Sequence, residues 1–135
     1  MSIFNDVLKF MKIGHPENIR DTPANPSDDV FALCRTLIKE EVGETLDAMG
    51  SGDIVEVADG IADSIYVLVY TAHCYGIPIN EVWAEVQRTN MAKFPGGVVT
   101  RRPSDGKIMK PEGWEPPDIK DILEAHGYRS KEPQP

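Results

Sequence analysis

The sequence predicts an all-α protein: an antiparallel helical bundle of four to five helices, followed by an irregular or short-hairpin C-terminal segment. Two observations support this fold class. Apolar residues recur at intervals of three and four, the spacing of one helix face, along most of the chain before residue 95. Short runs of glycine and proline separate these stretches. The 135 residues have the length of one domain, which we place at residues 1–128, with a flexible tail at residues 129–135.

The first predicted helix covers about the first dozen residues. Ser2 can cap its N-terminus, and Gly14 ends it. The apolar face in between consists of Phe4, Val7, Leu8 and Met11. The three prolines of residues 15–26 then predict a loop long enough to have a function, in which His15 is interpreted as a surface residue.

Two long helices are predicted at about residues 28–49 and 53–75. Ser27 can cap the first of them, ahead of two acidic residues that a helix N-terminus favours. The break between the helices, residues 50–52, is so short that the second helix must fold back along the first as an antiparallel hairpin. Beyond Asp63 the second helix is apolar on almost every side, so we expect it to be central.

A fourth helix is predicted from a cap at Asn80 to about Phe94. Helical periodicity then ends, and residues 98–110 predict a small hairpin or an ordered loop around a Ser-Asp-Gly turn. Residues 111–117 then predict an extended strap, in which Trp114 can pin the tail. Asp118 can cap a last short helix.

The apolar face of the helix at residues 28–49 turns acidic halfway along its length. Steps of three and four residues from its apolar start reach Glu41 and Glu44, and Glu40 lies on the flank of the same face. The second helix of the hairpin carries a matching acidic face, which consists of Glu56, Asp59 and Asp63. Two such faces turned toward each other need cations, raised pKa values or both, because a buried unpaired carboxylate is costly in free energy.

Hard divalent cations with oxygen ligands meet this need, and Mg²⁺ is the predicted cofactor, with Mn²⁺ as the alternative. The predicted metal ligands are Glu41, Glu44, Asp59 and Asp63. Glu40, on the flank, is the predicted catalytic residue, which orients or deprotonates a water molecule. A second interpretation stays open, in which these carboxylates are the solvated polar faces of amphipathic helices.

Basic residues gather in the last third of an otherwise acidic chain. Asn90 and Lys93 continue the inward face of the fourth helix, and Lys107 and Lys110 belong to the predicted hairpin segment. Ammonium and amide groups can bind phosphate oxygens that no metal covers. We therefore predict that these four residues bind the substrate, with a solvated run of charges as the alternative.

The order of these motifs resembles a known superfamily. The sequence EExxE at Glu40–Glu44, a short turn, and then D-x-x-x-D-x-x-Y-V from Asp59 are similar to the all-α nucleoside triphosphate pyrophosphohydrolases. These include the MazG proteins, dimeric dUTPases and phosphoribosyl-ATP pyrophosphohydrolase. The later Asn90-Met91-Ala92-Lys93 and Asp105-Gly106-Lys107 resemble the small phosphoribosyl-ATP-pyrophosphohydrolase-like members more closely. The resemblance covers roughly residues 3–119.

The resemblance implies an enzyme. Its expected reaction is Mg²⁺-dependent cleavage of a nucleoside triphosphate between the α and β phosphates, giving a nucleoside monophosphate and pyrophosphate. The resemblance also implies a homodimer or homotetramer built on the helical hairpins. Two alternatives stay open: phosphoribosyl-ATP hydrolysis in histidine synthesis, and a non-enzymatic, metal-binding helical module.

The chain departs from the family pattern at one position. The second motif of the family is usually ExxD, and aligning its Asp with Asp63 puts Gly60 where the Glu is expected. Either Asp59 replaces the missing carboxylate, or the motif has moved to Glu56-Val57-Ala58-Asp59. Helical geometry favours the first alternative, because Asp59 and Asp63 are four residues apart and share a face.

The composition argues against several classes of partner. The net charge is −8, from 22 acidic and 14 basic residues, which disfavours nonspecific binding to nucleic acid. The longest apolar run, residues 65–72, is far shorter than a membrane span, and no signal peptide is recognised. Cys34 and Cys74 show no metal-ligand spacing and are interpreted as core thiols. We therefore expect a cytoplasmic protein that binds neither nucleic acid nor membrane.

Overall fold

The structure of the protein is a computed structural model that describes residues 2–130. As predicted, these residues form five α-helices and no β-strand. The helices are α1 (Ile3–Gly14), α2 (Asp28–Ser51), α3 (Ile54–Cys74), α4 (Ile79–Met91) and α5 (Ile119–Ala125), with short 3₁₀ helices at Pro16–Asn18 and Pro95–Gly97. None of the described helices has both the length and the hydropathy that crossing a membrane requires. Most of the tail predicted at residues 129–135 lies outside the described residues.

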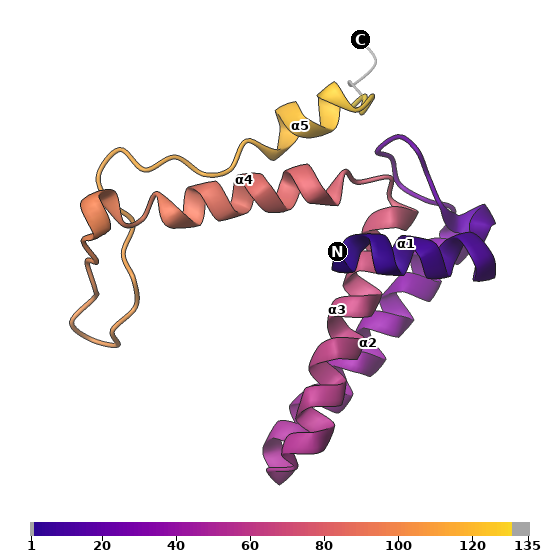
Figure 1. Ribbon diagram of the computed structural model, residues 1–135, viewed down its shortest axis with the longest axis horizontal. Coiled ribbons are helices and arrows are strands. Elements are labelled where there is room, and N and C mark those ends of the chain that lie inside the picture. The colour runs from indigo at the N-terminus through magenta and orange to yellow at the C-terminus, as the bar shows by residue number, and fades with distance from the viewer. Residues whose placement is uncertain (1, 131–135) are drawn as a thin grey trace.

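Helices α2 and α3 form a long antiparallel hairpin that projects from the rest of the molecule (Figure 1). α2 begins behind Ser27, whose side chain accepts a hydrogen bond from a backbone amide of the first turn at 3.3 Å. It ends before Gly52, which adopts the left-handed conformation (φ 73°) that glycine tolerates best. Asp53 then caps α3 by accepting from the amides of Val55 and Glu56. The predicted hairpin is confirmed.

Helices α2 and α3 are in close contact at Gly60, where α3 has no side chain. A Cβ atom at this position would overlap Thr45 Oγ1 and would lie 3.1 Å from Thr45 Cα, so a larger residue would push the helices apart. Thr45 Oγ1 itself donates a hydrogen bond to the Glu41 carbonyl at 2.7 Å and lies 3.1 Å from Ser64 Oγ. Small side chains therefore set the spacing of the two helices next to the predicted acidic face.

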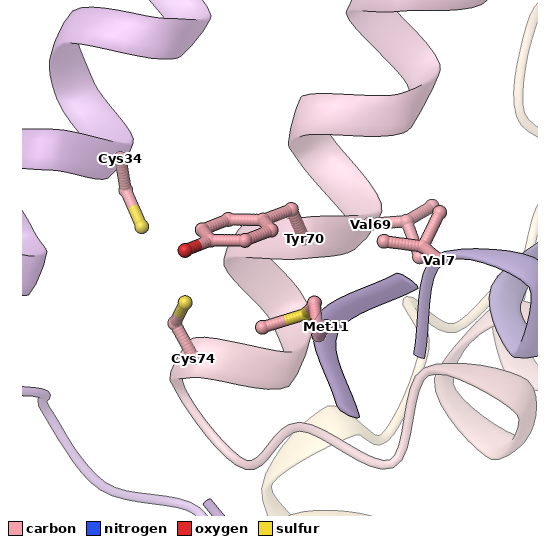
Figure 2. Close-up of a cluster of buried hydrophobic side chains, with 6 residues drawn as sticks. All are labelled: Val7, Met11, Cys34, Val69, Tyr70 and Cys74. Atoms are coloured by element: carbon pink, nitrogen blue, oxygen red, sulfur yellow. The ribbon is translucent and has the colours of Figure 1, made fainter. Parts of the chain in front are cut away.

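The core lies at the open end of the hairpin, where α1 packs on α3 (Figure 1). Figure 2 shows the side chain of Tyr70 reaching toward the thiols of Cys34 and Cys74, with Met11 of α1 beside it. Val7 and Val69 complete this buried cluster. Both cysteines are buried and free, so their interpretation as core thiols is confirmed.

Helices α4 and α5 form a second arm, which leaves the end of α3 and runs away from the hairpin (Figure 1). Glu85 pairs with Arg88 of the same helix at 2.7 Å, and it joins α4 to the start of α5 because it also accepts from the Asp118 amide at 2.8 Å. These bonds lower the pKa of Glu85 to about 2. Asp118 also caps α5, as predicted, by accepting from the Asp121 amide.

The start and the end of α4 differ from the prediction. The helix begins at Ile79, behind Pro78, and no side chain caps it, so Asn80 lies inside the first turn. Proline has a fixed φ angle that suits the entry to a helix, and here it takes the place of a polar cap. The helix ends at Met91 rather than near Phe94, because the Phe94 amide bonds back to the Met91 carbonyl in a tight turn.

Residues 98–110 form the predicted short hairpin, reduced to a single antiparallel bridge between Arg101 and Ile108. Behind it, the indole Nε1 of Trp114 donates to the carbonyl of Thr89 on α4 at 2.7 Å. This bond fixes the strap to α4.

Candidate functional site

Glu41 is the most enclosed of the acidic residues predicted on α2. Its side chain is half-buried, and its Oε2 atom is enclosed with no hydrogen-bond partner in the described part of the chain. Burial raises the pKa of Glu41 above its usual value of 4.5, and four neighbouring carboxylates raise the pKa further. In order of decreasing effect these are Glu44, Asp63, Glu40 and Asp59.

The hairpin thus brings together the five carboxylates that the sequence proposes for the site. Three come from α2 and two from α3, and each of the other four acts electrostatically on Glu41. Asp63 is half-buried like Glu41. The exposed members are Glu40, Glu44 and Asp59. The site is therefore an open acidic surface with one enclosed oxygen at its base.

The register of the hairpin distinguishes the two explanations for the missing Glu of ExxD, which are replacement by Asp59 and a motif moved to Glu56–Asp59. Gly60 faces Thr45 directly, so a carboxylate side chain at this position has no space. Asp59 and Asp63 both raise the pKa of the enclosed carboxyl group. Glu56, in contrast, is exposed in the first turn of α3 and is not among the groups that raise it. The arrangement favours Asp59 and Asp63 as the acidic pair of α3.

The five carboxylates suit a hard cation by their chemistry, although their side chains do not converge on one point. Oxygen ligands, negative charge and an enclosed oxygen without a partner are what Mg²⁺ or Mn²⁺ would satisfy. Within residues 2–130, no lysine or arginine forms an ion pair with any of them. Over the same range, no three His, Cys, Asp or Glu side chains lie close enough to hold a metal ion. The carboxylates would have to turn toward one another to share one.

The residues expected to bind phosphate gather at the far end of α4. Lys93 Nζ and Lys110 Nζ lie 5.4 and 4.8 Å from the centre of the same indole ring, that of Trp114. Lys107 is exposed in the adjoining hairpin, and Asn90 is exposed in the last turn of α4. We call Lys93, Lys107 and Lys110 the basic cluster.

Within one chain, the basic cluster and the acidic surface lie on different arms of the molecule. The cluster lies near the tip of the second arm, whereas the carboxylates lie around the middle of the α2–α3 hairpin (Figure 1). The two arms diverge from the end of α3. Asn90 and the basic cluster therefore lie on a different arm of the chain from the acidic surface.

A polar network at the open end of the hairpin has no signal in the sequence. The Tyr70 hydroxyl lies 3.1 Å from His15 Nδ1 and accepts from Asn18 Nδ2 at 2.9 Å. Burial is the largest of the effects that raise the pKa of Tyr70. The interpretation of His15 as a surface residue is thus incomplete: the residue is exposed, but it is also bonded to the core. No local pattern reveals this contact, because the two residues are 55 positions apart.

A hairpin of two long helices, with EExxE on one and an acidic face opposite it on the other, resembles the all-α nucleotide pyrophosphohydrolases, although paired aspartates stand here in place of ExxD. A comparison with protein families agrees with this class. The family model described as phosphoribosyl-ATP pyrophosphohydrolase matches residues 4–90, more than half of the chain. The chain therefore belongs to this family, within the MazG-like all-α superfamily, and is a nucleotide pyrophosphohydrolase, a hydrolase acting on phosphoanhydride bonds. No curated protein gives a significant match to the chain.

The family match covers the acidic hairpin but not the basic cluster. It begins at Phe4 in α1 and ends at Asn90 in the last turn of α4. The basic cluster and Trp114 lie beyond the matched residues. The family assignment therefore rests on α1, the hairpin and α4.

Proposed function

We propose that the protein is a Mg²⁺-dependent nucleoside triphosphate pyrophosphohydrolase, which cleaves between the α and β phosphates and releases a nucleoside monophosphate and pyrophosphate. The observation that carries this proposal is the enclosed Oε2 atom of Glu41, amid four other carboxylates. This arrangement is unfavourable by itself and becomes favourable when a divalent cation binds. A triphosphate has the complementary need, since its negative charge must be neutralised before water can attack.

The proposed metal ligands are Glu41, Glu44, Asp59 and Asp63, with Mg²⁺ as the cation and Mn²⁺ as the alternative. Bound there, the cation would neutralise phosphate oxygens and lower the pKa of a water molecule. Glu40 is the proposed catalytic residue. It is exposed on α2 and close enough to Glu41 to raise the pKa of that residue, so its carboxylate can accept a proton from the attacking water beside the metal ligands.

We further propose that the substrate binds between copies of the chain, in a homodimer or homotetramer. The basic cluster and Asn90 lie on a different arm from the acidic surface of their own chain, and opposite charges would draw the cluster of one copy to the acidic surface of another. The tip of the hairpin also exposes large apolar side chains, each to 60% or more: Leu46, Met49, Ile54 and Val55. Burying them against a second copy would stabilise the assembly.

Phosphoribosyl-ATP is the second candidate substrate. The observation in its favour is the match of residues 4–90 to the phosphoribosyl-ATP pyrophosphohydrolase family, which is named after this substrate. We rank it second because the basic cluster, to which we assign the polyphosphate, lies beyond the matched residues. The non-enzymatic alternative has lost its support, since the chain belongs to a family of hydrolases.

The test is a panel of nucleoside triphosphates and phosphoribosyl-ATP, incubated with Mg²⁺ and resolved by chromatography. We expect at least one triphosphate to give a monophosphate and pyrophosphate, and no turnover in EDTA. Repeating the reaction in ¹⁸O-labelled water identifies the phosphorus that is attacked, because the label enters either the monophosphate or the pyrophosphate. Release of a nucleoside diphosphate and inorganic phosphate, or hydrolysis of phosphoribosyl-ATP alone, would contradict the proposal.

A further inference from the structure

A separate pocket lies at the open end of the hairpin. Its volume is about 470 Å³, within the range of small-molecule sites. Asn25 from the loop before α2, Tyr75 at the end of α3, and Tyr128 and Arg129 after α5 line it. Tyr75 follows Asp63 by twelve residues, which at the rise of an α-helix separates them by about 18 Å along the axis. The pocket is therefore distinct from the acidic surface.

Backbone contacts hold the pocket in shape. The Ala24 amide donates to the Tyr75 carbonyl at 3.0 Å and ties the loop to the end of α3. At Gly76 (φ 64°), a Cβ atom would overlap the carbonyl oxygen of Thr22. At Gly127 (φ 98°), a Cβ atom would lie 3.1 Å from Thr22 Cγ2. The loop thus packs between two glycines from different parts of the chain, so the pocket is already formed before a ligand binds.

The lining of the pocket combines aromatic rings with cationic and amide donors. Tyr75 and Tyr128 contribute aromatic rings on which a ligand can stack. Arg129 Nη1 donates to the Tyr128 carbonyl at 3.0 Å, and the other N–H groups of this guanidinium can bind an anion. Asn25 adds an amide that can both donate and accept. Among the described residues that line the pocket none is acidic, although the chain as a whole has a net charge of −8. This combination fits a flat heterocycle that carries an anionic group.

We propose that this pocket binds a nucleoside monophosphate, with the base at the two tyrosines and the phosphate at Arg129. The choice of a nucleotide among anionic heterocycles rests on the proposed function, because a monophosphate is the product of that reaction. Binding here needs no metal, since the guanidinium supplies the positive charge. This separates the pocket from the acidic surface, where a polyphosphate requires a cation.

The test is calorimetric titration of the full chain with nucleoside monophosphates in EDTA. We expect saturable binding of at least one monophosphate, with inorganic phosphate and the corresponding nucleoside each binding about tenfold more weakly or worse, since each makes only part of the contacts. Arg129→Gln should weaken monophosphate binding about tenfold and leave nucleoside binding unchanged. Tyr128→Leu should weaken both. Arg35→Gln, an exposed arginine on α2 outside the pocket, is the matched control.

Two outcomes would overturn the inference: unchanged monophosphate affinity in Arg129→Gln, or inorganic phosphate that binds as tightly as the monophosphate. The inference and the proposed function also fail separately. A protein that binds a monophosphate in EDTA but hydrolyses no triphosphate contradicts only the proposed function. A protein that hydrolyses triphosphates but binds no monophosphate in EDTA contradicts only the inference about the pocket.

Discussion

The two halves of the α2–α3 hairpin are built from the same pair of helices but enclose very different groups. At the open end, Tyr70 is buried beside α1, and its hydroxyl is bonded by His15 and Asn18. In the middle, Glu41 has an enclosed oxygen with no partner among the described residues and four carboxylates around it. The open end therefore stabilises the hairpin, while the middle holds an arrangement that costs free energy and that a bound cation would relieve.

This difference teaches that the core and the acidic surface occupy separate lengths of the same two helices, whereas the close contact at Gly60 lies beside the acidic residues. Substitutions of the acidic residues should remove turnover and leave the fold intact, or even stabilise it in the absence of metal. Substitutions at the contact between the helices should lower stability. The following variants test that separation, in order of decreasing expected effect.

Glu41→Gln should have the largest effect, because it keeps the shape of the side chain and removes its charge. Turnover should fall below detection, since the central proposed ligand of the cation is lost. The free energy of unfolding in EDTA should stay the same or rise, because repulsion among the carboxylates decreases. Turnover with Mg²⁺ and thermal unfolding in EDTA measure the two effects. A fully active Glu41→Gln protein would refute the assignment.

Asp63→Asn and Asp59→Asn should each abolish most of the metal-dependent turnover, because both residues act on the enclosed carboxyl group. Glu56→Gln is the matched control on the same helix, and it should retain most activity, since Glu56 is exposed in the first turn. The measurement is the rate as a function of Mg²⁺ concentration. An inactive Glu56→Gln beside an active Asp63→Asn would place the motif one turn earlier, at Glu56 and Asp59.

Lys93→Ala should reduce kcat/KM by about 10- to 100-fold, because one lost charge-assisted contact to phosphate costs about 1.5–3 kcal/mol. Steady-state kinetics at saturating Mg²⁺ measures this change. Lys9→Ala, an exposed lysine on α1, is the control and should leave the rate unchanged. An unaltered kcat/KM in Lys93→Ala would show that Lys93 does not bind the substrate and would favour the alternative of a solvated run of charges.

Mixing the Lys93→Ala and Glu41→Gln chains tests whether the lysine acts in a second copy. If it does, an oligomer of both chains contains one site with intact carboxylates from the first chain and an intact lysine from the second. The mixture should then be more active than the sum of its separate components after subunit exchange. Strictly additive activity in a mixed oligomer would place Lys93 and the carboxylates in the same chain.

Gly60→Ala should lower the free energy of unfolding by about 1–3 kcal/mol, because the added Cβ overlaps Thr45 and the packed hairpin has no room for it. Gly43→Ala is the matched control in α2, since a Cβ there meets nothing within 4 Å. It should raise stability by about 0.5–1 kcal/mol through its better helix propensity. Urea denaturation of both variants measures the difference. Equal stability of the two would contradict the close contact.

The smallest expected effect is a pH dependence of stability without metal. The pKa of Glu41 is raised in the folded protein, so between the two pKa values the folded state binds more protons than the unfolded chain. The free energy of unfolding should therefore fall as the pH rises from the usual pKa of 4.5 through the raised one. The decline should be shallower in Glu41→Gln. Identical pH profiles of unfolding for the two proteins in EDTA would disagree with a raised pKa.

Local sequence signals predict most of the helix boundaries, because a helix cap depends on only a few neighbouring residues. Ser2, Ser27 and Asp118 cap their helices as expected from the sequence. Asn80 does not, since α4 begins at Ile79 behind Pro78 and no side chain caps it. The acidic face is equally predictable, because it follows from the 3.6-residue period and a short turn.

The placement of the basic cluster could not be predicted in this way. Its position relative to the acidic surface depends on the direction in which α4 leaves α3, and that direction follows from tertiary packing rather than from a local sequence pattern. The packing around Gly60 could not be predicted from local signals either. The sequence indicates a missing carboxylate at this position, but only the packed hairpin reveals that Thr45 fills the space.

The contact between Gly60 and Thr45 links two properties of the hairpin. These are the number of acidic groups on α3 and the distance between α2 and α3. A glutamate at position 60 needs room that only a wider hairpin, or a smaller residue at position 45, would provide. Positions 45 and 60 should therefore change together during evolution, as contacting residues do. In this chain, glycine at position 60 leaves that place on α3 without a carboxylate and lets Thr45 pack directly against the helix.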